Sequence, residues 1–116
     1  MFKITFYSTA KRDSPIAEFL DNLHLQPGKA CRIQHDQAIH QIRLLRNRGT
    51  WIGMPPVEFL EDGIWQLRPG CNHILFIQQG NTLVLLHAFP KGTGKTPKRE
   101  ILKAKAERAD WVSRMS

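Results

Sequence analysis

The residues from Asp62 to Pro97, DGIWQLRPGCNHILFIQQGNTLVLLHAFPKGTGKTP, contain three apolar runs joined by two short turns. The runs cover residues 64–68, 73–78 and 82–89, and their β-branched and aromatic residues favour strands. The Gly80-Asn81 pair fits a two-residue hairpin turn. The last run is almost continuously apolar, which predicts a central strand that is covered on both faces. This stretch therefore predicts the core of one sheet.

Further elements are predicted on both sides of this core. Residues 2–7 alternate between apolar and polar types, as a half-buried strand does. Ser14-Pro15 and Thr96-Pro97 each combine a helix N-cap with a favoured first helical residue. The remaining elements are expected at residues 15–24, 28–47, 57–60 and 97–112. The order β-α-α-β-β-β-β-α predicts an α+β fold. In it, a helical hairpin and a terminal helix pack on a small, mostly antiparallel sheet. At 116 residues, we expect a single domain over residues 1–116.

The patterns also predict which side chains are buried. A stripe on the second helix has positions that step by four, three, four and three: Cys31, His35, Ala38, Ile42 and Leu45. The inner face of the last helix is expected to carry Leu102, Ala106, Ala109 and Val112. Trp51, Gly53, Pro55 and Pro56 are expected in a loop.

The hairpin turn sets an expected register for the two histidines of the sheet. Counting from Gly80-Asn81 places His73 opposite Ala88, and His87 opposite Ile74. Cross-strand partners share a face, so the two histidines are predicted to point to opposite faces. On that register they do not form a paired acid and base.

The charge of the chain favours an anionic partner. The formal net charge is +7, and residues 91–108 hold seven lysines and arginines against two glutamates. A second basic cluster lies at the end of the second predicted helix and consists of Arg43, Arg46 and Arg48. Such an excess suits a nucleic acid or an acidic protein, although a merely soluble basic domain also fits.

The cysteine count and the hydropathy point to a cytoplasmic protein. Cys31 and Cys71 are too few and too far apart for a disulfide framework, so two reduced thiols are expected. No run approaches the roughly 18 apolar residues of a membrane span. We therefore expect no membrane association.

The loop GTGKT, residues 92–96, resembles the end of a nucleotide-binding P-loop but does not complete one. That motif requires a glycine five positions before Gly94, where this chain has Phe89. Lys91 and Lys95 still place two point charges beside a predicted helix N-terminus, which suits a polyanion. A flexible, solvated loop is the alternative.

Other candidate residues carry weaker signals. His35 and His40 do not have the spacing of a His-Glu-x-x-His zinc motif, and we expect no metal and no cofactor. Arg68 ends a strand beside a Pro-Gly turn, where it can bind a phosphate or simply pair with a carboxylate. His73 follows five residues later and can lie near it across the turn.

Four pieces in order resemble toxins of the RelE/ParE superfamily, which belong to bacterial type II toxin–antitoxin pairs. They are DGIWQLR at 62–68, HILF at 73–76, LLHAFPK at 85–91 and GKTP at 94–97. The terminal helix, with Glu100-Ile101 and its alanines, fits the same pattern. The resemblance spans about residues 57–111 and is strongest to the HigB-like, phage Gp49-like group.

The resemblance implies a ribosome-dependent mRNA endonuclease that inhibits translation. Its partners would be the ribosome, mRNA and an antitoxin protein, commonly of the helix-turn-helix type. Cleavage would proceed without a metal, by attack of the ribose 2′-hydroxyl on the adjacent phosphate. Arg68 and Lys91 would stabilise charge, with His73 as a third catalytic residue. Candidate RNA contacts are Lys95, Lys98, Arg99, Arg46 and Arg48.

Two positions depart from the family pattern. His73 stands where the family has a sheet arginine, and Gly92 stands at the second lysine of the loop. A histidine can serve there as an acid or base, because its ordinary pKa is near neutrality. Two alternatives stay open. One is a non-enzymatic ParE-like toxin that acts on a protein such as gyrase. The other is a non-toxic, basic nucleic-acid-binding prophage protein.

Overall fold

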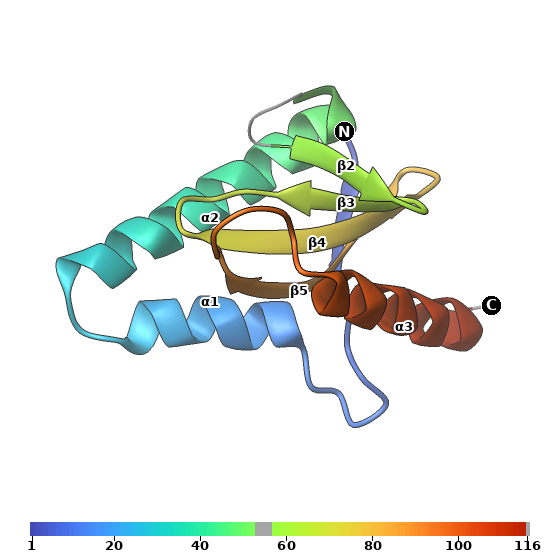
Figure 1. Ribbon diagram of the computed structural model, residues 1–116, viewed down its shortest axis with the longest axis horizontal. Helices are drawn as coiled ribbons and strands as arrows, with labels where there is room; N and C mark the ends of the chain where they lie inside the picture. The colour runs from blue at the N-terminus through green and yellow to red at the C-terminus, as the bar shows by residue number, and fades with distance from the viewer. Residues whose placement is uncertain (53–56, 116) are drawn as a thin grey trace.

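A computed structural model describes residues 1–52 and 57–115 of the chain (Figure 1). The predicted loop residues Gly53, Pro55 and Pro56 lie outside the described residues. In chain order the elements are β1 (Lys3–Phe6), α1 (Pro15–Leu25), α2 (Lys29–Arg48), a 3-10 helix (Gly49–Ile52), β2 (Val57–Glu61), β3 (Ile64–Leu67), β4 (Asn72–Gln79), β5 (Thr82–Pro90) and α3 (Lys98–Met115).

The strands form one five-stranded sheet in the order β1-β5-β4-β3-β2. β1 runs parallel to β5, and the other neighbours are antiparallel. The sheet, the helical hairpin and the terminal helix confirm the predicted α+β fold. The run of buried residues in β5 agrees with the predicted central strand, since β5 lies between β1 and β4.

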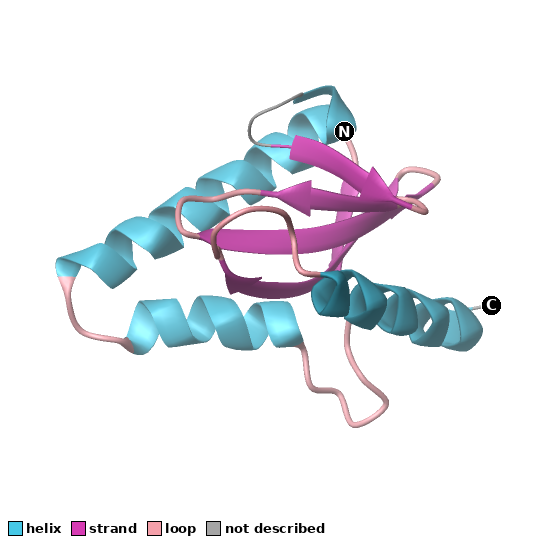
Figure 2. Ribbon diagram, viewed as in Figure 1, coloured by secondary structure: helices cyan, strands magenta, loops and turns pink. Residues whose placement is uncertain are grey.

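Helices cover both faces of the sheet (Figure 2). On one face, α1 and α2 pack through Ile16, Ile42 and Leu45 on side chains that include Ile74 and Leu85. On the other face, Ala104 of α3 packs in a cluster with Leu75, Val84 and Leu86. Alternate residues of β4 and β5 thus enter two separate cores, as the pleat of a strand requires.

Local sequence signals explain where the helical hairpin begins and ends. The Ser14 hydroxyl accepts a hydrogen bond from the Ala17 N–H (3.3 Å), which caps α1. α2 ends at Gly49, whose φ is 58°. A Cβ at Gly49 would meet the ring of Phe2 at 2.6 Å, so this position also requires a residue without a side chain.

The predicted burial of α2 is wrong in its first turns. Ala38, Ile42 and Leu45 are buried, but Cys31 and His35 are only half-buried. The start of α2 extends past the sheet, beside the end of α1 (Figure 1). Residues in those turns therefore have no sheet face to cover.

The predicted inner face of α3 is also wrong. Leu102 is 54% exposed, and Ala106, Ala109 and Val112 are exposed as well. The buried face is made by Ile101, Ala104 and Glu107. A hydropathy pattern predicts that a glutamate lies on the solvent-facing side of a helix. Here the carboxylate of Glu107 is buried against a histidine of β5.

A β-bulge changes the expected register of β4 and β5. The pairing counted from the turn holds as far as Phe76 opposite Leu85, and then shifts by one residue. His73 therefore faces Phe89, and His87 faces Leu75. Because His73 and Leu75 share a face, the two histidines lie on the same side of the sheet, against the prediction.

Among the described helices, none combines the length and the apolar character that crossing a bilayer requires.

Candidate functional site

A cavity of about 680 Å³ lies on the α3 side of the sheet, between strands β2 to β4 and the loop that precedes α3. Its floor comes from strand residues and its wall from the loop and the first turn of α3. The lining residues are Glu58, Phe59, Leu60, Glu61, Gln66, Arg68, His73, Lys91, Gly94, Lys95, Thr96, Lys98 and Ile101. Four cations against two carboxylates make this cavity suited to an anion.

The cavity brings together a large part of the predicted site. Arg68, His73, Lys91, Lys95 and Lys98 all line it. They come from the end of β3, the start of β4, the loop after β5 and the start of α3. The β4–β5 pairing explains part of this convergence, because it places Asn72 opposite Pro90 and so brings the next residue, Lys91, beside the β3–β4 turn.

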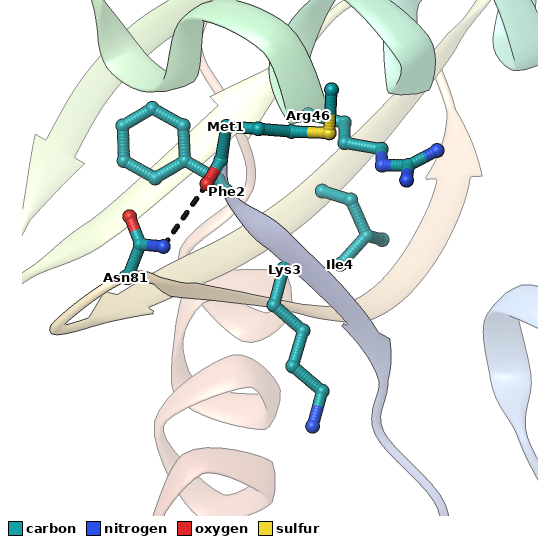
Figure 3. A pocket seen from close by; sticks show the side chains of 6 residues that line it. All are labelled: Met1, Phe2, Lys3, Ile4, Arg46 and Asn81. Carbon is teal, nitrogen blue, oxygen red and sulfur yellow. Dashed lines mark hydrogen bonds between the residues drawn. The ribbon is translucent and has the colours of Figure 1, made fainter.

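The other predicted RNA contacts lie elsewhere. Arg99 is 81% exposed and lies 3.9 Å from Glu100, outside the lining of this cavity. Arg46 lines a separate cavity of about 500 Å³ with the first four residues and Asn81 (Figure 3). Asn81 is at the far end of the β4–β5 hairpin, roughly 23–26 Å from His73 at about 3.3 Å per strand residue. Arg48 is exposed on the same last turn of α2 as Arg46.

Arg68 is held at the cavity by both its backbone and its side chain. Its carbonyl accepts a hydrogen bond from Gln41 Nε2 (3.2 Å). Its Nη1 lies 3.6 Å from Glu58 Oε1, and each of the two side chains is 31% exposed. The buried Nε of Arg68 has no hydrogen-bond partner among the described residues. The guanidinium therefore keeps donor capacity for a ligand oxygen.

His73 is a buried histidine that favours its neutral form. It is 7% exposed, and its ring meets the Phe89 ring edge-on at 5.3 Å between centroids. Burial lowers its pKa, and the charges of Arg68 and Lys91 lower it further, while Glu58 opposes them. Its buried Nδ1 has no partner among the described residues. The ring is thus a neutral group that can accept a proton beside several cations.

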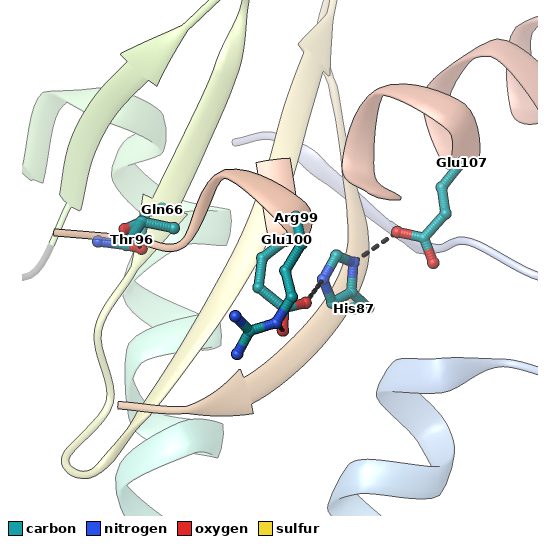
Figure 4. A network of polar contacts seen from close by, with 6 residues as sticks. All are labelled: Gln66, His87, Thr96, Arg99, Glu100 and Glu107. Atoms are coloured by element: carbon teal, nitrogen blue, oxygen red, sulfur yellow. Dashed lines mark hydrogen bonds and ion pairs between the residues drawn. The ribbon is translucent and has the colours of Figure 1, made fainter. Parts of the chain in front are cut away.

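The loop before α3 is anchored at both ends. The Lys91 N–H donates to the Cys71 carbonyl (2.7 Å). The Thr96 hydroxyl donates to Gln66 Oε1 (2.6 Å), so β3 holds the other end (Figure 4). The ammonium groups of Lys91 and Lys95 between these anchors form no ion pair with described residues. They remain free to contact a phosphate.

A row of glutamines on α2 supports the turn between β3 and β4. Gln34 Oε1 accepts from the Cys71 N–H (3.1 Å) and from Asn72 Nδ2 (3.2 Å). Gly70 has φ of 68°, and a Cβ there would clash with the side chains of Gln34 and Gln37. Together with the bond from Gln41, these contacts position the segment that carries Arg68 and His73.

Sequence reasoning missed Glu58, Gln66 and these glutamines. Counting across the Glu61–Gly63 turn would have paired the β2 and β3 residues, but a bulge between Phe59 and Glu61 shifts that register. The glutamine spacing of three and four residues on α2 does mark one helical face. Nothing in that spacing says that the face meets a turn near residue 70.

Comparison with protein-family models matches residues 21–109 to the family described as phage derived protein Gp49-like (DUF891). The matched stretch includes every residue that lines the cavity. Comparison with curated proteins gives no match.

Proposed function

The chain belongs to the Gp49-like family of phage-derived proteins, and on that premise we propose that it is the toxin of a type II toxin–antitoxin pair. Within the RelE/ParE superfamily, we assign it to the HigB-like group. Its activity is that of an endoribonuclease that cleaves mRNA on the ribosome and so inhibits translation. Residues 1–116 act as one cytoplasmic toxin domain.

The observation that carries this proposal is the placement of a neutral, buried histidine among cations. His73 has an unpartnered Nδ1, while Arg68 and Lys91 both act on its charge and line the same cavity. A site built for transphosphorylation of RNA needs these two functions together: a proton acceptor, and positive charge where the phosphorane forms.

The reaction follows from these groups. The neutral imidazole of His73 takes the proton of a ribose 2′-hydroxyl, and the 2′-oxygen attacks the adjacent phosphorus. The P–O5′ bond breaks, which leaves a 2′,3′-cyclic phosphate and a 5′-hydroxyl. Arg68 stabilises the negative charge of the phosphorane. Lys91 and Lys95 contact the phosphate and supply an N–H proton for the leaving oxygen.

The remaining basic surface supports binding of a longer RNA. Lys98 extends the basic lining of the cavity along α3, and the exposed Arg99 adds a positive charge outside the cavity. Arg46 and Arg48, near the far end of the sheet, are too distant for the same phosphate and serve the surrounding ribosomal RNA or mRNA. The partner that neutralises the toxin is an antitoxin of the helix-turn-helix type.

A translating extract tests this function with the purified chain. We expect cleavage of a translated mRNA, with 5′-hydroxyl and 2′,3′-cyclic phosphate ends, and no cleavage when the ribosomes are removed. Arg68→Ala should lower the rate by about 10²–10³-fold, as loss of one charge-stabilising donor does. Intact mRNA at all concentrations would contradict the proposal. DNA damage without RNA cleavage would instead support a ParE-like action on gyrase.

A further inference from the structure

His87 is a buried histidine that the proposed cleavage does not use. It is 1% exposed and lies between two carboxylates of α3. Its Nδ1 is 2.5 Å from Glu107 Oε1, and its Nε2 is 3.0 Å from Glu100 Oε1 (Figure 4). Glu107 is itself 8% exposed, so this contact is shielded from water. Both ring nitrogens therefore face a carboxylate oxygen, Glu107 in a buried contact and Glu100 in a part-buried one.

The two hydrogen-bond contacts limit which protonation states favour this cluster. A neutral imidazole has one N–H donor and one lone pair. With both carboxylates ionised, one nitrogen lone pair would face a carboxylate lone pair, which is costly where water cannot intervene. A doubly protonated ring donates to both carboxylates, and both contacts become charge-assisted hydrogen bonds.

The surrounding charges support a cationic ring. Arg99 Nε lies 3.9 Å from the second oxygen of Glu100 but is 81% exposed, so the two carboxylates beside the ring are paired with one solvent-screened cation. From the end of β1, Tyr7 stays neutral, because burial and its hydrogen bond to Asp110 raise its pKa to about 12. From the sheet, the neighbours of His87 are apolar: it faces Leu75, and its ring lies 5.9 Å from the Phe89 ring centroid.

We propose that His87 is a positioning residue whose imidazolium, held between Glu100 and Glu107, fixes α3 and thereby the wall of the RNA cavity. The catalytic part of this inference rests on the proposed function. Glu100 belongs to the first turn of α3, which also carries the cavity residues Lys98 and Ile101.

A second connection runs through the sheet. The Phe89 ring contacts both histidines, with centroids 5.3 Å from His73 and 5.9 Å from His87. The Phe89 ring is thus the group through which the His87 cluster and the proposed proton acceptor are packed together.

Loss of the second ring proton would reverse this arrangement. The bare nitrogen then faces a carboxylate, and the contact between β5 and α3 weakens. Glu107→Gln removes the need for that proton, because the amide N–H₂ donates to the Nδ1 lone pair while Nε2–H still donates to Glu100. The variant keeps both contacts with one proton fewer, which makes it a sharper probe than removal of the histidine.

Nitrogen NMR of the histidine side chains in the full chain tests the proton count. In the unchanged protein we expect both His87 nitrogens to be protonated. In Glu107→Gln we expect one protonated and one bare nitrogen. A neutral His87 ring in the unchanged protein would overturn the proposal. This readout does not depend on RNA cleavage, so it separates the failure of this inference from the failure of the proposed function.

The pH dependence of unfolding and of the His73 signal tests the positioning role. In the alkaline range the unchanged protein should lose thermal stability, and the His73 ring signal should move with it. Both responses should be absent in Glu107→Gln and retained in Glu18→Gln, which changes an exposed carboxylate on α1. Where cleavage is measured, the alkaline loss should appear in kcat rather than KM. Identical profiles for Glu107→Gln and the unchanged protein would overturn the positioning role.

Discussion

The guanidinium of Arg68 lies 3.6 Å from the carboxylate of Glu58 on the neighbouring strand. Both side chains are 31% exposed, so solvent screens part of their attraction. Among the groups that act on the pKa of His73, Glu58 is the one that raises it, against burial, Arg68 and Lys91. Glu58 therefore offsets part of the positive charge of Arg68, the proposed phosphate-binding residue. It also limits how far the pKa of His73, the proposed proton acceptor, is lowered.

The first prediction concerns the substitution Glu58→Gln. Because the raising influence is removed while the lowering ones remain, the pKa of His73 should fall further below its ordinary value. An NMR titration of the His73 ring measures this. Glu61→Gln is the matched control, since Glu61 lines the same cavity but pairs with Lys105 at 2.8 Å. A rise in the His73 pKa in Glu58→Gln would contradict the electrostatic account of the cavity.

The second prediction concerns the acid limb of cleavage. A neutral His73 is needed as the proton acceptor, and its pKa lies below the ordinary value of 6.5. The acid limb of the kcat/KM profile, which reports the free enzyme, should therefore be centred below pH 6.5. An acid limb centred above 6.5 would show that another group, or a cationic His73, is the acceptor.

The same shift carries a stability prediction of defined sign. The folded state binds a proton at His73 less readily than the unfolded state does, so its contribution to stability is fully present above pH 6.5. It is lost as the pH falls through the lowered pKa. Urea unfolding at several pH values should show this loss, and His73→Gln should remove that component. If the stability of His73→Gln depended on pH in the same way as that of the unchanged protein, a lowered pKa of His73 would be contradicted.

The third prediction compares two glycines. Gly70→Ala forces a side chain into a positive φ and against Gln34 and Gln37, so it should destabilise the protein by about 1–3 kcal/mol. Gly92→Ala is the control, because a Cβ there meets nothing within 4 Å. It should change stability by less than about 0.5 kcal/mol. Equal unfolding midpoints for the two variants would show that the α2 glutamines do not hold the turn.

The fourth prediction restores a cation at the family's second lysine position. Gly92→Lys has open space for its side chain and adds positive charge to the loop that lines the cavity. Binding of a single-stranded RNA should tighten, and the salt dependence should steepen by about one counterion. Fluorescence anisotropy over a range of salt concentrations measures both. Weaker binding, or an unchanged salt slope, would argue that the loop does not face the RNA.

The fold could be predicted from the sequence to a large extent, because its signals are local. Turn residues such as Gly80-Asn81 and the alternating strand residues 2–7 act over a few positions. The convergence of Arg68 and Lys91 on one cavity is explained in part by the same local signals, because both residues stand beside recognisable strand ends.

What the sequence did not reveal depends on long-range contacts. The bulge that brings His73 and His87 to one face leaves no residue signature in β4 or β5. Burial of Glu107 makes sense only beside His87, which is 20 positions away in the chain. The pairing of Glu58 with Arg68 likewise follows from tertiary geometry rather than from spacing.

The most direct test of the central claim is mapping of mRNA 5′ ends after brief induction of the chain in bacterial cells. We predict new 5′ ends within translated codons, which disappear when translation is blocked beforehand. They should also disappear in the double variant Arg68→Ala/Lys91→Ala. The charge-matched control Lys11→Ala/Lys29→Ala, which changes two exposed lysines outside the cavity, should keep them. Intact transcripts and normal growth with the unchanged chain would contradict the account.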